Sequence, residues 1–151
     1  MPKTFSAAFL HIAFSTKGRA ASLSDAIQPE LFAYLIGIAR RRDVVPVCVG
    51  GWFDHVHLLV RVPPRIAVSN LVRDLKCNSS AWIHRRWPGY GRFAWQDGFA
   101  SFSVSPGRVE AVRRYIENQR AHHSGRSFES ELEELVVGAG FEFDRAFLDD
   151  E

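Results

Sequence analysis

Two histidines interrupt an otherwise apolar stretch, FDHVHLLVRV, at residues 53–62. Side chains of a β-strand alternate between its two faces, so His55 and His57 share one face while Val56 and Leu58 share the other. Two neutral imidazoles on one face can bind the same divalent ion. The stretch therefore predicts either a metal site or a polar, half-exposed strand face backed by an apolar core face.

A second set of polar side chains lies in RRYIENQRAHH, residues 113–123, which we expect to be helical. Tyr115 and Gln119 are four residues apart, so on one helix they lie one above the other. They border the apolar stripe that would pack the helix on a sheet, formed by Val109, Val112 and Ile116. If His55 and His57 open onto the same edge, two imidazoles, an amide oxygen and a phenol form one cluster.

Such a cluster would suit phosphoryl transfer. Imidazole nitrogens and an amide oxygen can hold a divalent ion that polarises a phosphodiester. A tyrosine hydroxyl, with an ordinary pKa of about 10, becomes a competent nucleophile when a metal or a base assists its deprotonation. Attack on DNA would leave a phosphotyrosine bond that conserves energy for rejoining, without a nucleotide cofactor. Taken alone, Tyr115 is more simply interpreted as a packed aromatic residue at a helix edge.

Other residues near these motifs are weaker candidates. His122 and His123 could approach an ion near Gln119, although surface or DNA-phosphate contacts are the simpler interpretation, and His11 is expected to be a hydrogen-bonded polar residue of a strand. Three tryptophans could stack on unpaired bases: Trp52, Trp87 and Trp95. Four cations on predicted polar faces are candidate contacts to the DNA backbone: Lys17, Arg73, Lys76 and Arg114.

The order of the secondary-structure elements decides how these motifs meet. Hydrophobic periodicity and turn residues predict a strand over 5–15, a helix over 29–42, two strands within 44–62, a helix over 67–87, a strand or hairpin over 92–104, a helix over 106–123 and a short helix from 127. This order is typical of an α+β fold in which a ferredoxin-like or RRM-like antiparallel sheet packs against helices.

Composition favours a nucleic-acid partner. The 151 residues, 46% hydrophobic and 24% charged, are those of one globular domain. Residues 127–151 hold one basic and nine acidic side chains, so residues 1–126 hold 18 basic and 8 acidic ones. A basic body is the electrostatic footprint of a nucleic-acid binder. The charges thus divide the domain into a basic body over 1–126 and an acidic helix and tail over 127–151.

Targeting signals and disulfides are not indicated. The sequence has no apolar stretch long enough for a membrane span and no signal-peptide pattern at its start. Cys48 and Cys77 lack a CxxC spacing, and we interpret them as reduced thiols. These features predict a cytoplasmic protein without a membrane partner.

HVHLLV followed by a helix with YIENQ resembles the HUH single-tyrosine transposases of the insertion sequence 200 type, which include the REP-associated tyrosine transposases. Four further segments are similar to that family in the same order: HIAFSTKGR, PRIAVSNLVRDLKCNSSAWI, FAWQDGFASFSVSP and NQRAHHSGRSFESEL. The resemblance extends from about residue 4 to the tail. The combination of the two motifs is far more specific than either motif alone.

This resemblance implies a DNA transposase that acts on single strands, with its catalytic domain over 1–126 and the acidic helix and tail over 127–151 as part of the same domain. His55, His57 and Gln119 would bind Mg²⁺ or Mn²⁺, and Tyr115 would form a 5′-phosphotyrosine link that frees a 3′-hydroxyl. The DNA partner would be a hairpin near the element ends. The family also implies a homodimer in which the tyrosine helix of one subunit completes the histidine site of the other, although the residues before 106 permit either arrangement.

Three alternatives remain open from the sequence. A host-retained relative would use the same chemistry on chromosomal palindromic repeats. An RRM-like binding module would not need the metal or Tyr115 for any effect on DNA. A histidine-based metal hydrolase of small phosphate esters would turn over substrate without a covalent adduct.

Overall fold

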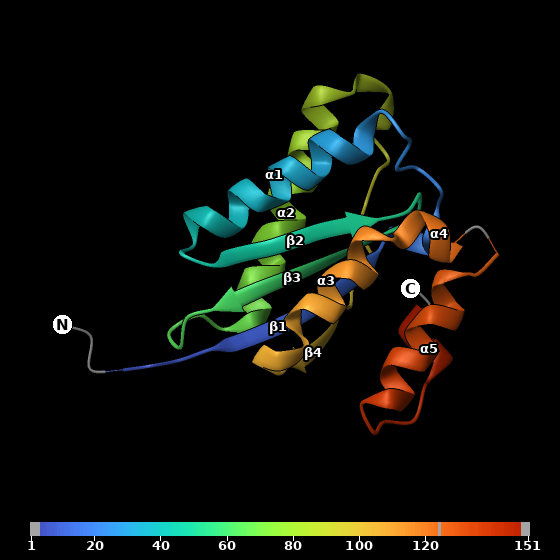
Figure 1. Cartoon of the computed structure of the whole chain (residues 1–151). Coiled ribbons are helices and arrows are strands. Elements are labelled where there is room, and N and C mark those ends of the chain that lie inside the picture. The colour runs from blue at the N-terminus through green and yellow to red at the C-terminus, as the bar shows by residue number, and fades with distance from the viewer. Residues whose placement is uncertain (1–3, 124, 149–151) are drawn as a thin grey trace.

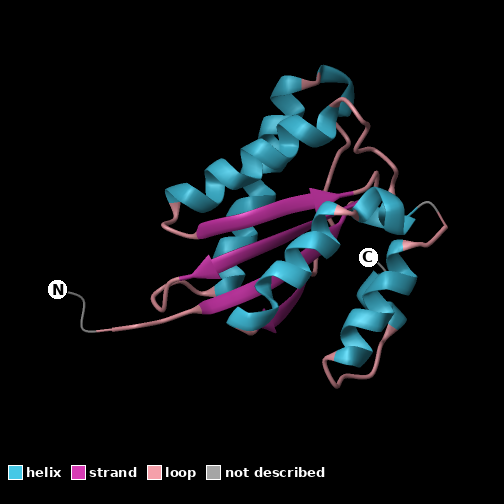
Figure 2. Ribbon diagram, in the orientation of Figure 1, coloured by secondary structure: helices cyan, strands magenta, loops and turns pink. Residues whose placement is uncertain are grey.

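The computed structural model describes residues 4–123 and 125–148 (Figures 1 and 2). The chain forms a strand, a helix, two strands, a helix and a fourth strand, followed by three helices. In order these are β1 (Ala8–Ser15), α1 (Ile27–Arg41), β2 (Val45–Gly51), β3 (His55–Val62), α2 (Val68–Arg86), β4 (Ala100–Val104), α3 (Val109–Glu117), α4 (Gln119–His123) and α5 (Phe128–Gly138).

The four strands form one antiparallel sheet in the order β2-β3-β1-β4. β1 and β3 are therefore the central strands, and their register pairs His57 with Ala13 and His55 with Ser15. The antiparallel sheet and the βαββαβ order confirm the predicted α+β, ferredoxin-like fold. The histidine pair consequently lies on a central strand, where backbone hydrogen bonds on both sides fix its position.

Helices cover both faces of the sheet (Figure 2). On one face α1 and α2 bury the alternate apolar residues of the two central strands, Ile12, Phe14, Val56, Leu58 and Val60. Burial of each such side chain stabilises the fold by about 1.5–3 kcal/mol. On the other face α3 and α5 pack over Leu59 and Ala13, which places the histidine face of β3 beneath the last three helices. The alternation predicted for residues 53–62 is thus confirmed from His55 onward.

The predicted helix over 106–123 is interrupted. A short 3-10 turn at Pro106–Arg108 leads into α3, which ends at Glu117. Asn118 follows with φ −97° and ψ 23°, and α4 begins at Gln119. Tyr115 and Gln119 therefore lie on two helices instead of on one continuous helix. Such a break is not visible in the sequence because the helical spacing of the side chains continues across it.

Two adjacent glycines at the end of β2 lie against neighbouring backbone, Gly50 against α3 and Gly51 against β3. A Cβ atom on Gly50 would overlap the carbonyl oxygen of Ile116, and one on Gly51 would overlap the carbonyl oxygen of His55. Both positions are therefore close-approach sites, where only glycine leaves room for the neighbouring backbone. The close approach at Gly50 fixes Ile116, the residue next to Tyr115, against β2.

The start of α5 agrees with the predicted position. Ser127 precedes the helix in extended conformation, and its hydroxyl accepts a hydrogen bond from the backbone N–H of Ser130. This N-cap satisfies one of the otherwise unpaired N–H groups of the first turn. Among the residues that the structure describes, no helix has the length and apolar character needed to cross a bilayer.

Candidate active site

A buried carboxylate, that of Glu131 on α5, lies at the centre of the histidine face. Its Oε1 atom is 2.9 Å from Nε2 of His57, 3.2 Å from Nε2 of His123 and 3.3 Å from Nε2 of His55. Glu131 is only 1% exposed, and both strand histidines are fully buried. A buried charge requires such partners, so three imidazoles gather around one carboxylate oxygen.

The second carboxylate oxygen contacts the helix residues. The hydroxyl of Tyr115 donates a hydrogen bond to Oε2 of Glu131, and the amide Nε2 of Gln119 donates to the same atom at 3.0 Å. The amide oxygen of Gln119 lies 2.9 Å from Nε2 of His55. The structure thus brings together all four side chains that the sequence singles out, within one chain and despite the break between α3 and α4.

The other ring nitrogen of each strand histidine has its own partner. Nδ1 of His55 lies 2.7 Å from a carboxylate oxygen of Asp54, the preceding residue. Nδ1 of His57 lies 2.7 Å from Nε2 of His11, a buried residue of β1. Partners of this kind fix the ring orientation and the tautomer of histidines that bind metal.

The charges of the cluster are distributed unevenly. Burial lowers the pKa of His55, but hydrogen bonds to Asp54 and Glu131 outweigh it and raise that pKa to about 9. Burial also lowers the pKa of His57, and there the contact with Glu131 offsets only part of the effect. Burial, together with the neighbouring His57, lowers the pKa of His11 to about 3. These surroundings therefore favour the protonated form of His55 and the neutral forms of His11 and His57.

The phenol and the carboxylate also depart from their ordinary behaviour. Burial would raise the pKa of Glu131, but hydrogen bonds from His123, His55 and His57 hold it well below its usual range. Burial first, and then the hydrogen bond to Glu131, raise the pKa of Tyr115 well above that of a free tyrosine. In this arrangement Glu131 is ionised and Tyr115 keeps its proton.

The donor atoms suit a divalent cation. One ligand atom each from His55, His57 and Glu131 lies within 4.8 Å of the others, and the amide oxygen of Gln119 is next to His55. Imidazole nitrogens with carboxylate and amide oxygens form a mixed set that accepts Mn²⁺ or Mg²⁺. The residues present therefore fit an ion, and Glu131 is a candidate ligand in addition to the three that the sequence predicts.

The sequence profile of the family described as "Transposase IS200 like" matches residues 4–119, which span β1 to the first residue of α4. The chain belongs to this family. No curated protein shows significant similarity to it.

Two solved structures share the fold of this IS200-like transposase. One is a candidate transposase from Deinococcus radiodurans R1, 25% identical, with a TM-score of 0.64 over 79% of this chain and 95% of that one. The other is a REP-associated tyrosine transposase bound to a REP hairpin, 14% identical, with a TM-score of 0.60 over 82% of this chain and 72% of that one. At 14% identity the second likeness concerns the fold alone.

Sequence reasoning missed part of the cluster. Glu131 lies beyond the matched stretch, in an acidic helix that looks like a solvent-exposed surface element. His123 was a weaker candidate, yet it contacts Glu131; the side chain of His122 lies outside what the structure describes. His11 is hydrogen-bonded, as expected, and its partner is His57 on the neighbouring strand. Asp54 is not among the predicted site residues, although its position beside His55 in the sequence indicates that the two side chains could interact.

The predicted DNA contacts differ in their surroundings. Lys17, Arg73 and Arg114 are exposed, and Arg114 lies 3.7 Å from Glu110. Lys76 instead donates to the carbonyl oxygens of residues 96 and 98, at 2.7 and 2.6 Å. Trp95 is buried and its indole N–H donates a hydrogen bond to the hydroxyl of Ser79, so its ring is not available for base stacking. Trp52 and Trp87 are half-buried.

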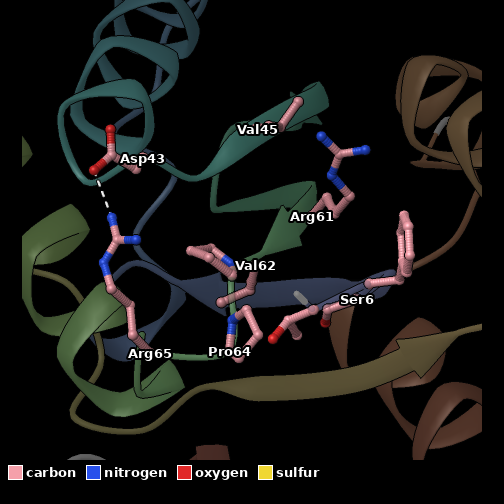
Figure 3. A pocket seen from close by; sticks show the side chains of 10 residues that line it. Ser6, Asp43, Val45, Arg61, Val62, Pro64 and Arg65 are labelled. Atoms are coloured by element: carbon pink, nitrogen blue, oxygen red, sulfur yellow. Dashed lines mark hydrogen bonds and ion pairs between the residues drawn. The ribbon is translucent and has the colours of Figure 1, made fainter. Parts of the chain in front are cut away.

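Two surface hollows lie at opposite ends of β2. One of about 560 Å³ is lined by Val45, Arg61 and Val62, at the opposite end of β3 from His55 (Figure 3). None of the predicted site residues lines it. A hollow of about 200 Å³ is lined by Gly50 and Gln119 among others, and therefore adjoins the cluster.

Proposed function

We propose that this protein is a metal-dependent, single-tyrosine transposase that cleaves and rejoins single-stranded DNA at hairpin-marked ends through a 5′-phosphotyrosine intermediate. One observation carries the proposal: in a chain of the IS200-like family, Tyr115, His55, His57 and Gln119 converge around a single buried carboxylate. A module that only binds nucleic acid does not need a phenol beside a histidine pair.

His55, His57 and Gln119 would hold the ion, together with Glu131. When bound, Mg²⁺ or Mn²⁺ supplies Lewis acidity that polarises the scissile phosphate and stabilises charge on its oxygens. No nucleotide cofactor is required, because the tyrosine ester retains the energy of the broken phosphodiester. Asp54 would keep the imidazole of His55 oriented through its Nδ1 atom.

Tyr115 is the nucleophile in this proposal. Its oxygen forms the new bond to phosphorus, the bond from phosphorus to the 3′-oxygen breaks, and that oxygen leaves as a hydroxyl after taking a proton from water. The phenol must lose its own proton, and Oε2 of Glu131 already accepts a hydrogen bond from it. The raised pKa of Tyr115 means that the arrangement described here is a resting one. In the rejoining step the free 3′-hydroxyl attacks a phosphotyrosine and releases Tyr115.

Hairpin DNA is the proposed partner, supported by the basic excess over residues 1–126 and by the fold shared with a transposase bound to a REP hairpin. That same likeness supports a second candidate, a host-retained enzyme acting on chromosomal palindromic repeats. Both candidates use the same residues. The exposed cations Lys17, Arg73 and Arg114 would contact the backbone.

The test is a denaturing gel with labelled single-stranded hairpins taken from both flanks of the gene. We expect a protein–DNA adduct that requires Mn²⁺ or Mg²⁺ and Tyr115, and that is absent in Tyr115→Phe. Tyr90→Phe, at a tyrosine distant from the cluster in the sequence, is the matched control and should form the adduct at the wild-type level. Hairpin binding without an adduct, with either ion, would contradict the transposase and favour the binding module.

A further inference from the structure

His11 is a buried titratable residue for which the proposed chemistry has no direct use. It lies on β1, where it pairs with Leu59 of β3 and with Phe102 of β4, and only 4% of it is exposed. Its Nε2 atom is 2.7 Å from Nδ1 of His57. A hydrogen bond between two buried imidazoles requires a proton on one of the facing nitrogens and a lone pair on the other.

The direction of this hydrogen bond depends on what His57 binds. Without an ion, Nε2 of His57 faces a carboxylate oxygen of Glu131 at 2.9 Å and must donate its proton there. With its ring proton on Nε2, His57 offers a lone pair at Nδ1, which lies 2.7 Å from Nε2 of His11, so His11 is the donor. To bind a cation, His57 must instead offer the lone pair of Nε2, so its proton moves to Nδ1 and His11 becomes the acceptor.

An imidazole at position 11 can serve in both situations, since a neutral imidazole has one donor and one acceptor nitrogen and can exchange them. A carboxylate could only accept. The contrast with His55 is direct, because Asp54 occupies the corresponding position at its Nδ1 atom. The two strand histidines are thus supported differently, one by a fixed acceptor and one by a partner that can change its role.

We propose that His11 is a positioning residue that holds His57 in the ring orientation and tautomer in which Nε2 can bind the divalent ion. This inference rests on the proposed function, because it requires that His57 is a metal ligand. Partners of this kind contribute about 10–100-fold to metal affinity. His11 also packs against Phe102, with ring centroids 6.2 Å apart, so a purely structural role must be separated from a positioning role.

The experiment measures Mn²⁺ affinity by calorimetry on the full chain without DNA. His11→Phe keeps an aromatic ring but removes the hydrogen bond, and we expect about 10–100-fold weaker binding. His11→Gln places an amide that can donate or accept, and should recover most of this loss. Phe102→Leu disturbs the packing around His11 without touching its hydrogen bond, and should bind the ion as the wild type does. The unfolding midpoint of each variant reports on folding separately.

If His11→Phe bound Mn²⁺ as tightly as the wild type, the positioning role would be overturned while the proposed function would stand. The same conclusion would follow if His11→Gln and His11→Phe lost equal Mn²⁺ affinity. A wild-type protein that binds no ion would overturn the metal site as well. A second measurement needs no variant: nitrogen-detected NMR of the histidine rings with diamagnetic Zn²⁺ in place of Mn²⁺. We expect Nδ1 of His57 to become protonated when the ion binds, and an unprotonated Nδ1 would overturn the proposal.

Discussion

The hydroxyl of Tyr115 donates a hydrogen bond to the carboxylate of Glu131, and this contact joins the proposed nucleophile to the helix that follows the family's matched stretch. The other oxygen of the same carboxylate faces the strand histidines. α5 is therefore part of the site itself, and one of the nine acidic residues after position 126 has a specific place among the catalytic candidates.

The first prediction concerns Glu131 as a metal ligand. Replacing Glu131 with Gln removes the anionic oxygen that faces the three imidazoles, so Mn²⁺ should bind at least about tenfold more weakly. Glu133→Gln removes the same charge from an exposed position of α5 and should leave the affinity unchanged. Calorimetry on the DNA-free protein measures both. Tighter binding by Glu131→Gln would show that the carboxylate competes with the ion for the histidines.

The second prediction concerns the number of chains in one site. His57 and Tyr115 of the same chain contact the same carboxylate, so a second subunit is not needed to complete the cluster. Mixing His57→Ala chains with Tyr115→Phe chains should therefore leave adduct formation at background. Each variant mixed with wild type serves as the control for interference between chains. Recovery of the adduct in the mixture would show that Tyr115 of one subunit acts at the histidine site of the other, as the family resemblance implies.

The third prediction links metal binding to pH through His55. Both ring nitrogens of His55 face acceptors, and its pKa of about 9 means that it is protonated at neutral pH without metal. A cation must displace this proton, so Mn²⁺ affinity should rise by up to about tenfold per pH unit from neutral pH and level off above pH 9. His57 is neutral and adds no proton to this release.

Calorimetry at pH 7.5 in two buffers of different ionisation enthalpy measures the protons released. We expect about one proton per ion for the wild type. Asp54→Asn removes a partner that raises the pKa of His55, so that variant should release fewer protons and show a weaker dependence on pH. Binding of Mn²⁺ to the wild type without proton release would contradict the assignment of a charged His55.

The sequence is sufficient for the sheet and for the two motifs because both depend on local information. Alternating side chains place His55 and His57 on one face of β3, and the order of elements predicts the antiparallel sheet. The break at Asn118 is different. The spacing of Tyr115 and Gln119 fits one continuous helix, and only the packing of the folded chain shows that two helices are present.

Glu131 and Lys76 were beyond sequence reasoning for a related reason. A glutamate in the acidic stretch SFESELEEL is indistinguishable from its solvent-exposed neighbours until the helix is docked. Lys76 has the position of a surface cation on α2, yet it contacts the carbonyl oxygens of residues 96–98, some 20 residues later in the chain. Both contacts are long-range, so neither leaves a periodic pattern.

The fourth prediction tests the close approach of α3 to β2. A methyl group at position 50 would overlap the backbone of Ile116, so Gly50→Ala should displace the helix that carries Tyr115 and destabilise the fold by about 1–3 kcal/mol. Gly37 lies within α1 with open space around its Cβ position, and Gly37→Ala should stabilise by about 0.5–1 kcal/mol. Urea unfolding measures both. Equal stability of the two variants would show that α3 does not approach the strand this closely.

The fifth prediction separates a structural role of Lys76 from the proposed DNA contact of Arg73 on the same helix. Lys76 donates to backbone carbonyl oxygens of the segment before β4, so Lys76→Met should lower the free energy of unfolding by about 1–3 kcal/mol. Arg73 is exposed one turn earlier, and Arg73→Met should leave stability unchanged while weakening hairpin binding and its dependence on salt. Thermal unfolding and DNA titrations at two salt concentrations distinguish the two effects. If Lys76→Met keeps wild-type stability and loses only DNA affinity, the ammonium group contacts DNA instead of holding this segment.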